Sequence, residues 1–414
     1  MKKHILAASA GAIALAGLAW AAAGGFSGGS GGGFVLLPAS SGGGAASAPR
    51  AIQPSPAADT GEFRLAADGR HIVDSYICVF RGGSVARGQE RAEANRSANA
   101  AGGQVGHVYE NTIRGFSVHA SAQGVARMQA GNRNIDYCEQ DQVMAVIDGV
   151  QAQARPGSGP PPAESTPYGI ARVNGGGVTG GGAAWVIDTG IDLDHPDLNV
   201  DAARSRNFVT RETSPEDLNG HGSHVSGTIA AKKGNGIGVV GVSPGSTLVA
   251  IRVLNRNGRG SNSDVIAGVD WVGGHGVAGD VANMSLGGGV SQALDDAVVA
   301  ASSRVKFALA AGNESEDANN HSPGRANGPN IYTVSAVNST DTFASFSNFG
   351  NPPVDYAEPG VSILSTWKDG GYNTISGTSM ATPHMAGLLL IGLRSDGRTA
   401  KNDPDGNPDL IGLH

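Results

Sequence analysis

The C-terminal two thirds of the chain alternates short apolar runs with longer amphipathic stretches. Continuous apolar runs predict buried β-strands at residues 183–187, 247–253, 281–286, 305–311 and 331–337. Apolar residues at helical spacing predict α-helices at 221–232, 262–273, 291–302 and 379–393. Apolar strands separated by helices are typical of a parallel sheet that is covered on both faces. The pattern therefore predicts an α/β fold with a doubly wound, mostly parallel sheet over residues 168–393.

Residues 74–150 show a different order of elements. A strand-like run at 76–80 precedes a helical pattern at 86–101, and two further strands are indicated at 105–109 and 113–118. A short helix at 122–129 and a last strand near Tyr137 follow. This β-α-β-β-α-β order predicts a small α+β, ferredoxin-like domain ahead of the larger sheet.

Three segments lack the hydrophobic periodicity of helices or strands that pack into a core. Residues 24–73 begin with a long run of Gly, Ser, Ala and Pro, which is typical of a linker. Residues 151–167 contain several prolines and predict an exposed linker that is open to cleavage. Residues 394–414 are rich in Asp, Gly and Asn and predict a polar C-terminal tail.

The first 23 residues have the composition of an export signal. Lys2 and Lys3 precede an apolar stretch that ends in small residues, which predicts a secretory signal peptide at 1–23. A retained membrane anchor is the alternative, and Gly11 and Gly17 weaken it. No later apolar run is long enough to span a bilayer, so we expect no stable membrane association after cleavage and an extracellular or periplasmic location.

Charge and cysteine content limit the classes of partner. Lys and Arg number 29 against 36 Asp and Glu, so the net charge of −7 excludes an electrostatic nucleic-acid binder. The two cysteines, Cys78 and Cys138, would both lie in the predicted small domain. In an exported protein they are able to form a disulfide, and buried free thiols are the alternative.

Residue types for nucleophilic catalysis occur where parallel strands end and helices begin. Asp188 follows a predicted strand, and His221 and Ser379 each open a predicted helix after a glycine-rich turn. A serine hydroxyl becomes a good nucleophile when an imidazole takes its proton, and a carboxylate orients that imidazole. Each residue alone also suits a turn or a helix cap. Together with the segment 310–313, which ends in Asn313, they favour a catalytic site.

The segments 185–192, 219–228 and 376–384, in the order Asp, His, Ser, resemble the subtilisin-like serine proteases. The proteinase K branch is the most similar, because segments 360–367 and 375–384 look like its closing segments. The resemblance implies a serine endopeptidase that acts through an acyl-enzyme, with Ser379 as nucleophile, His221 as general base and Asp188 as its partner. Asn313 and the Ser379 backbone N–H would bind the oxyanion.

The same resemblance implies protein or peptide substrates that bind as an added strand between segments 258–261 and 285–287. The residues that it assigns to substrate binding are Gly258, Gly260, Ser285, Leu286, Gly287, Ala310, Ala311 and Gly312. Small residues at 310–312 would leave room for a bulky apolar or aromatic side chain. The rim of this predicted pocket carries three acidic residues, Glu314, Glu316 and Asp317. The sequence leaves open whether they allow the pocket to accept a substrate Lys or Arg side chain. The alternative is that they form a solvated acidic loop.

Residues 74–147 resemble the inhibitor-type propeptide of this family, through the segments 76–80, 114–116 and 137–139. Such a propeptide would template folding, inhibit the enzyme within its own chain and be removed by self-cleavage. Cys78 and Cys138 would then lie on neighbouring strands, and the mature enzyme would be a monomer without cysteine.

The resemblance also implies structural calcium, with no cofactor for the chemistry. One site would combine Asp355 with the carbonyls of Pro329 and Ile331, and a second Asp197 and Asn235 with the carbonyls of Ile237 and Val239. Lys232 and Lys233 stand close to the second site. The tail 403–409 places oxygen-bearing side chains at alternate positions, like the first half of a calcium loop, but it has no closing Glu. A solvated turn is the alternative there.

Other classes of protein fit less well. A non-catalytic secreted binding protein on the same fold would not need all four catalytic positions filled. A metal hydrolase that uses His221 and His224 would need a following Glu and a third ligand, which the sequence does not supply. The Gly-x-Ser-x-Gly pattern of an α/β-hydrolase occurs only at 28–32, where no strand precedes it.

Overall fold

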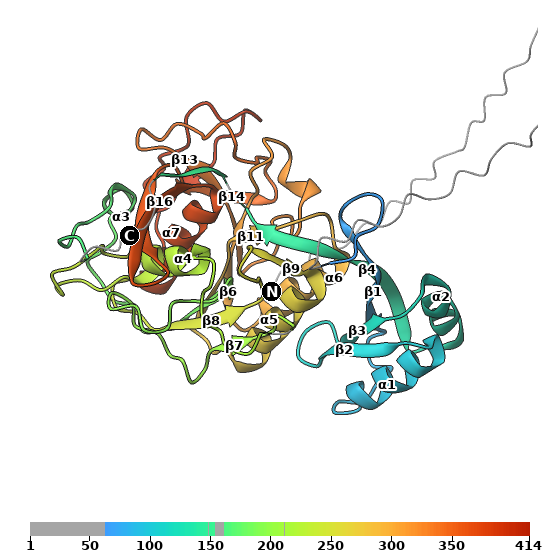
Figure 1. The fold of residues 1–414 in the computed structure, drawn as a ribbon. Helices are drawn as coiled ribbons and strands as arrows, with labels where there is room; N and C mark the ends of the chain where they lie inside the picture. Colours follow the sequence, from blue (N-terminus) through green and yellow to red (C-terminus); the bar gives the residue numbers. More distant parts are fainter. Residues whose placement is uncertain (1–62, 148, 154–160, 211) are drawn as a thin grey trace, which may run out of the picture. The chain divides into compact units, whose positions relative to one another are not determined.

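The computed structural model describes residues 63–147, 149–153, 161–210 and 212–414 (Figure 1). The predicted signal peptide, most of the predicted linker 24–73 and the prolines at the start of 151–167 lie outside these residues. Within the described residues, no helix is long and apolar enough to cross a membrane.

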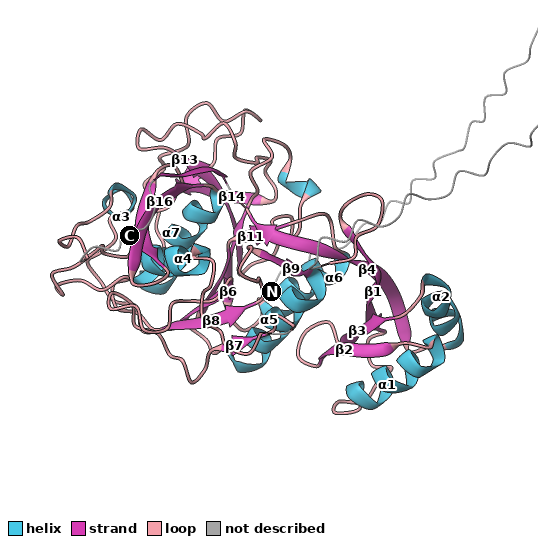
Figure 2. Cartoon of the chain, in the orientation of Figure 1, coloured by secondary structure: helices cyan, strands magenta, loops and turns pink. Residues whose placement is uncertain are grey.

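The N-terminal subdomain (residues 63–147) has the predicted β-α-β-β-α-β order. Its elements are β1 (His71–Phe80), α1 (Glu90–Ala101), β2 (Gln104–Tyr109), β3 (Gly115–His119), α2 (Ala122–Gly131) and β4 (Ile135–Val146). The strands pair antiparallel in the order β4-β1-β3-β2. Helices α1 and α2 lie on one face of this sheet (Figure 2). Their apolar side chains pack against those of the strands. The first strand, β1, begins at His71, before the predicted start of this domain at residue 74, and Leu65 already pairs with Ile72.

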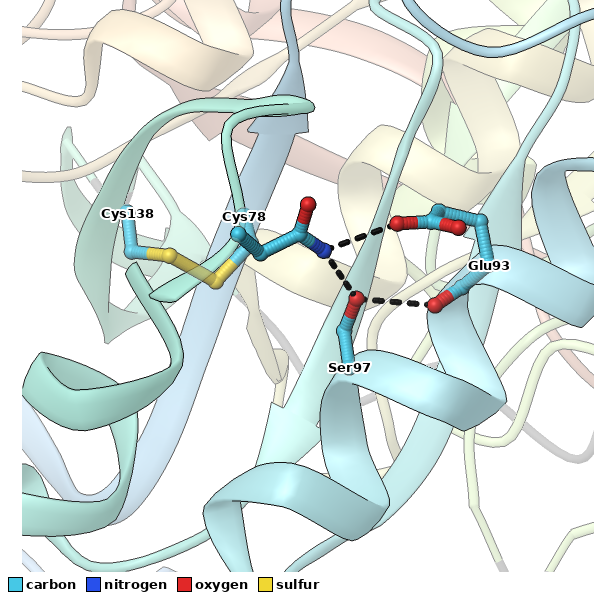
Figure 3. The surroundings of a disulfide bond; sticks show 5 residues. Cys78, Glu93, Ser97 and Cys138 are labelled. Carbon is cyan, nitrogen blue, oxygen red and sulfur yellow. Dashed lines mark hydrogen bonds between the residues drawn. A yellow bond between two sulfur atoms is a disulfide. The ribbon is translucent and has the colours of Figure 1, made fainter. Parts of the chain in front are cut away.

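A disulfide joins the first and last strands of this subdomain. Cys78 and Cys138 are directly opposite in the β1–β4 ladder and form a disulfide bond, so the free-thiol alternative does not hold (Figure 3). Nearby, the Asn132 amide donates to Glu93 Oε1 and Ser97 Oγ, each at 2.8 Å, and ties the end of α2 to α1. The disulfide closes a loop across a sequence separation of 60 and so restricts the unfolded chain.

Among the described residues, the main sheet has eight parallel strands in the order β17-β14-β13-β12-β10-β6-β8-β7. In chain order they are β6 (Ala184–Asp188), β7 (Arg206–Asn207), β8 (Leu248–Arg252), β10 (Val281–Met284), β12 (Lys306–Ala310), β13 (Ile331–Val337), β14 (Val354–Pro359) and β17 (Leu410–Ile411). The five strands predicted from apolar runs form its centre. This arrangement confirms the doubly wound parallel sheet.

Helices cover both faces of the main sheet. Helices α5 (Asn262–His275) and α6 (Gln292–Ala301) pack on one face, and α4 (His221–Ala230) and α7 (Thr378–Ile391) pack on the other. Successive residues of a strand point to opposite faces. Accordingly, Trp185 and Ile187 of β6 join the core under α5 and α6, whereas Ala184 and Val186 join the core under α4 and α7.

Several short elements were not predicted. Strands β15 (Ile363–Trp367), β16 (Gly371–Ser376) and β5 (Gly149–Gln153) form a small antiparallel sheet, so part of the predicted linker 151–167 is a strand. Strands β9 (Arg259–Ser261) and β11 (Leu286–Gly287) pair with β4. The short helices α3 (Tyr168–Arg172) and η1 (Ala318–Asn320) lie in connections. The predicted polar tail contributes β17, which closes one edge of the main sheet.

Candidate active site

The candidate catalytic residues lie at the carboxyl ends of the central strands. Strand β6 ends at Asp188 and lies between β8 and β10, where the strand order reverses direction. Ligand sites of doubly wound sheets form at such a switch point. His221 is the first residue of α4, and Ser379 lies in the first turn of α7.

Asp188 and His221 form a buried pair. His221 Nδ1 lies 2.8 Å from Asp188 Oδ1, and the two residues are 3% and 0% exposed. A carboxylate only accepts hydrogen bonds, so the proton of the imidazole is on Nδ1. Nε2 is therefore the nitrogen that is able to accept a proton from a nucleophile. The Thr189 backbone N–H donates to the same Asp188 oxygen at 2.7 Å and fixes the carboxylate.

A second aspartate, Asp217, holds the turn in front of His221. Its carboxylate accepts the backbone N–H groups of Asn219 (2.9 Å), Gly220 (2.8 Å) and Ser223 (2.9 Å). Burial raises the pKa of Asp217, while these hydrogen bonds favour its charged form. We did not predict this positioning residue. The local signal that would have identified it is the Asp-x-Asn-Gly pattern, Asp217 to Gly220, just before the predicted helix.

Gly220 is required where this turn enters α4. Its φ is +116°, and a Cβ atom at this position would lie 2.2 Å from Trp367 Cε2. Only glycine adopts this conformation and leaves room for the indole ring. The local sequence thus brings the backbone into the close turn that orients the His221 side chain.

Ser379 is fixed against the end of β10. Its Oγ donates to the carbonyl of Ser285 at 2.9 Å and lies 3.2 Å from the Ile147 carbonyl oxygen. In return, Ser285 Oγ donates to the Ser379 carbonyl at 2.9 Å. Ser285 was predicted to bind substrate, and it also positions the candidate nucleophile.

The amide of Asn313 points toward the same Ile147 carbonyl. Asn313 Oδ1 accepts hydrogen bonds from the backbone N–H and the hydroxyl of Thr378, at 2.9 and 3.0 Å. These two donors fix the orientation of the amide group, so that Nδ2 donates to the Ile147 carbonyl oxygen at 3.0 Å. The Ile147 carbonyl therefore lies between the candidate oxyanion donor and the candidate nucleophile.

The residues in front of Ile147 form a strand between two short strands of the main domain. Strand β4 pairs antiparallel with β9 on one side and with β11 on the other. Met144 is opposite Gly260, and Val146 is opposite Leu286. The Val146 N–H donates to the Gly258 carbonyl at 2.9 Å. The segments 258–261 and 285–287 thus lie on either side of an extended strand that belongs to the chain itself.

Small residues surround the side chains of this inserted strand. A Cβ on Gly287 would lie 3.0 Å from Ile147 Cδ1, and a Cβ on Gly288 would lie 2.6 Å from Met144 Sδ. Met144 is fully buried and joins the apolar core under α5 and α6. The strand therefore presents apolar side chains to apolar surroundings.

The predicted pocket residues Ala310, Ala311 and Gly312 lead directly from β12 into Asn313. Gly312 has a φ of +113°, and its N–H donates to Thr378 Oγ1 at 3.2 Å. At the rim, Glu314 Oε2 accepts the Asn348 amide at 2.7 Å. Glu316 lies 2.6 Å from His321 Nε2, and Asp317 accepts the Asn319 N–H at the start of η1. These carboxylates thus already have polar partners in this state.

Carboxylates of β4 cap two helices of the main domain. Asp141 accepts the Ser263 N–H at 3.2 Å in the first turn of α5, and Glu139 accepts the Ala293 N–H at 3.2 Å in the first turn of α6. Negative groups are stabilised at helix N-termini. Burial nevertheless raises the pKa of Asp141 to about 6.

The main domain also holds the turn between β2 and β3. Asp270 of α5 accepts the backbone N–H groups of Glu110 (3.1 Å), Asn111 (2.9 Å) and Thr112 (2.8 Å). Sequence reasoning missed Asp270, because nothing local marks a helix carboxylate as the partner of a distant turn. These contacts and those of β4 fix the N-terminal subdomain beside the candidate site.

His224 is not arranged as a metal ligand. It is fully buried, it donates from Nε2 to the Ile363 carbonyl at 2.9 Å, and burial lowers its pKa to about 3. Over the described ranges, no three His, Cys, Asp or Glu side chains come together as a metal-binding group. The geometry thus gives no support to a metal hydrolase built on His221 and His224.

The first predicted calcium site has suitable oxygen donors. The Asn330 carbonyl accepts from Phe307 of β12, and carbonyls alternate in direction along a strand, so the carbonyl of Ile331, the first residue of β13, faces the β14 side. Pro329 lies in the turn just before this strand. Asp355 lies on that side, where it accepts the Thr333 N–H at 3.0 Å. Burial raises the pKa of Asp355, a cost that a cation would offset. This donor set fits calcium.

The second predicted calcium site does not fit a cation in this structure. Asp197 accepts the Asn235 amide N–H at 2.7 Å and the Val239 backbone N–H at 3.0 Å. Asn235 Oδ1 accepts the Ile237 N–H at 3.1 Å, so the amide nitrogen and not the oxygen faces the carboxylate. The Asp197 carboxylate already has donors, and calcium would have to displace them.

Known proteins are similar to this chain in sequence and fold. Residues 185–394 match the sequence profile of the subtilase family. An alkaline serine exoprotease A from Vibrio alginolyticus is 39% identical over 379 residues, covering 83% of this chain and 67% of that protein. An extracellular serine proteinase from Thermus sp. (strain Rt41A) is 41% identical over 307 residues, covering 73% and 72%. A solved structure of a cold adapted subtilisin-like serine proteinase has 40% identity and a TM-score of 0.51, and covers 59% of this chain and 96% of that one.

The subtilase profile matches half of the chain, and the two relatives are 39% and 41% identical over 83% and 73% of it. These matches define the class of protein. The chain belongs to the subtilase family. It is a serine-type endopeptidase with the subtilisin-like fold.

Proposed function

We propose that this subtilase is a secreted endopeptidase that acts through Asp188, His221 and Ser379 and matures by cutting its own chain after Ile147. One observation carries the proposal. The Ile147 carbonyl oxygen accepts Asn313 Nδ2 at 3.0 Å and lies 3.2 Å from Ser379 Oγ, at the end of a strand held between β9 and β11. A carbonyl in this place is positioned as the carbonyl of a peptide bond to be cleaved.

The reaction then follows the chemistry of a serine protease. Ser379 Oγ attacks the carbonyl carbon while its proton passes to His221 Nε2, and Asp188 stabilises the imidazolium through Nδ1–H. Asn313 Nδ2 and the Ser379 backbone N–H stabilise the oxyanion. The C–N bond breaks, His221 returns the proton to the departing amine, and an acyl-enzyme on Ser379 remains. Water activated by His221 releases the acid and restores the serine.

The proposed cleavage site lies before the segment that the sequence favours. The sequence favoured a site within 151–167, because prolines and small residues make that segment accessible. The carbonyl next to Ser379 instead belongs to Ile147, which follows β4 directly. We therefore propose that the peptide bond between Ile147 and Asp148 is cleaved.

The N-terminal subdomain is the proposed intramolecular inhibitor. Its strand β4 occupies the positions that a substrate would take beside β9 and β11. The contacts of Glu139 and Asp141 with α6 and α5, and of Asp270 with the β2–β3 turn, hold the subdomain in place. Because the strand pairs through backbone groups, protein substrates of varied sequence would bind in the same way. The buried Met144 and the apolar Ile147 favour substrates with apolar side chains at the matching positions.

Calcium is proposed at the first site, where Asp355 and the carbonyls of Pro329 and Ile331 would hold it. The ion would supply charge compensation for the buried carboxylate and stabilise the folded enzyme. It takes no part in the proposed reaction. We further propose that the chain is exported through residues 1–23 and that the mature enzyme acts as a monomer.

Intact mass and N-terminal sequencing of the secreted protein test the maturation. We expect wild-type protein to show a new N-terminus at Asp148 and the Ser379→Ala variant to remain joined across Ile147 and Asp148. The matched control is Ser376→Ala, which changes a serine of the same motif whose hydroxyl accepts the Ser362 N–H. It should be processed like wild type. Cleavage of the Ser379→Ala variant at the same bond, in a host without other proteases, would contradict self-processing.

A further inference from the structure

Both cysteines of the chain, Cys78 and Cys138, lie in the N-terminal subdomain and form its disulfide. Residues 148–414 contain no cysteine. Under the proposed function, in which the residues up to Ile147 are a removable inhibitor, the mature enzyme keeps neither sulfur atom. The disulfide therefore acts on the chain only before the subdomain leaves.

The disulfide anchors the strand that enters the candidate active site. Cys138 lies in the first half of β4, directly opposite Cys78 of β1 (Figure 3). The second half of β4 continues to Ile147, whose carbonyl oxygen lies 3.2 Å from Ser379 Oγ. This half pairs with β9 over three residues and with β11 over two. Such short ladders are weak by themselves, so the placement of Ile147 depends on the folded subdomain behind it.

The core of this subdomain is small. Among the described residues, its buried apolar cluster has twelve members, of which four are alanines: Ala94, Ala98, Ala101 and Ala120. Alanine side chains bury little apolar area, and a domain of this size gains limited stability from its core alone. Cys78 is itself a member of the cluster. The disulfide thus crosslinks the subdomain through its core.

Two buried carboxylates lower the stability of the subdomain further. Glu90 and Glu93 of α1 are 1% and 5% exposed. Arg114 donates from Nε to Glu90 Oε1 at 2.9 Å, and the Asn132 amide donates to Glu93 Oε1 at 2.8 Å. Glu90 Oε2, in contrast, is buried without a hydrogen-bond partner. Buried charge that is incompletely paired costs free energy, and a small core with this cost needs a crosslink to stay folded.

We propose that the Cys78–Cys138 disulfide makes maturation of this enzyme dependent on the redox state of the chain. Its formation passes two electrons and two protons from the two thiols to the disulfide of a thiol–disulfide oxidant, which becomes a dithiol. With the bond formed, the subdomain folds and β4 presents the Ile147 carbonyl to Ser379. As a dithiol, the subdomain opens and this peptide bond is not presented. The chain therefore matures in an oxidising compartment and stays uncut in a reducing one.

Hydrogen exchange of the full-length Ser379→Ala variant tests the folding step, because this chain keeps its subdomain. The folded protein is treated with dithiothreitol until thiol labelling shows that both sulfur atoms are free. We expect the amide groups of β1 to lose protection by roughly 30- to 1,000-fold, the range typical of a native disulfide. Those of β10 and β12, in the part without cysteine, should not change and are the internal control. Equal protection of β1 in both forms would overturn the proposal.

Refolding of the wild-type chain tests the maturation step. The denatured chain is diluted into buffer either as the dithiol or with the disulfide formed, and cleavage after Ile147 is followed by intact mass. The reduced chain should be cut more slowly, on the order of tenfold or more. A Cys78→Ser/Cys138→Ser variant should be slow with or without dithiothreitol. Mature enzyme should keep full activity in the reductant, because it has no disulfide to lose.

The outcomes separate this proposal from the proposed self-processing. If the oxidised and reduced chains are cut after Ile147 at the same rate, redox control is overturned and self-processing stands. If only the double serine variant is slow, the sulfur atoms act through packing and redox control is again overturned. If neither form of the wild-type chain is cut, self-processing fails, and the hydrogen-exchange comparison decides whether the disulfide holds the subdomain folded.

Discussion

Replacing Ser379 with alanine is expected to reduce peptide hydrolysis by a factor on the order of 10⁶, a figure that belongs to the equivalent change in a subtilisin. The substitution removes the hydroxyl that is placed to attack the substrate carbonyl. Asp188 and His221 then have no nucleophile to activate. The oxyanion donors and the strand contacts remain. Residual turnover above the uncatalysed rate is therefore expected, and KM should change little.

The measurement needs a variant without its inhibitor, since Ser379→Ala cannot cut its own chain. A trace of wild-type enzyme is used to cleave the variant in trans, and the cleaved variant is purified and treated with a fluorophosphonate to silence the residual wild type. Hydrolysis of a chromogenic peptide is then compared with that of Ser376→Ala, which should keep full activity. Activity of the Ser379→Ala variant within tenfold of wild type would disprove Ser379 as the nucleophile.

The centre of the fold was predictable because it is encoded locally. The runs that form β6, β8, β10, β12 and β13 are mostly apolar, as expected for strands that are covered on both faces. Helices α4 and α7 begin at glycine-rich turns that the sequence marks plainly. The residues proposed for catalysis lie at these same junctions, so that their approximate place followed from the same patterns.

What the sequence did not reveal depends on partners that are far apart along the chain. Strands β9 and β11 are two or three residues long and exist as strands through their pairing with β4. The length of β4 itself, and with it the position of Ile147, is set by this pairing and not by local periodicity. For the same reason Asp270 was not singled out, since it binds backbone N–H groups of a turn that lies 158 residues away at Thr112.

Accessibility was also an incomplete guide to the proposed processing site. The composition of 151–167 favours exposure, but a bond is cut where its carbonyl meets the nucleophile and the oxyanion donors. The backbone geometry places the Ile147 carbonyl beside Ser379 Oγ and Asn313 Nδ2. Proximity in the folded chain therefore outweighs local accessibility in choosing the proposed bond.

The second large effect is expected at Asn313. Substitution by alanine should lower kcat by about 10²–10³, with a small change in KM, because the amide donates to charge that is greatest in the transition state. The range comes from an oxyanion-hole asparagine of a subtilisin. In this chain, Thr378 holds Asn313 Oδ1 through its N–H and hydroxyl, so Nδ2 is already aimed at the carbonyl oxygen before the reaction begins.

The Asn313→Asp variant distinguishes the loss of the hydrogen-bond donor from the loss of side-chain volume. Aspartate has the same size and still accepts the hydrogen bonds from Thr378, but it offers no N–H and brings a negative charge next to the oxyanion. Its kcat should therefore fall at least as far as that of Asn313→Ala, although its fold is less disturbed. Steady-state kinetics on a peptide substrate, with circular dichroism to verify folding, decide the matter. If Asn313→Asp kept wild-type kcat, the oxyanion would be stabilised by other groups and the amide would serve only to hold the turn before α7.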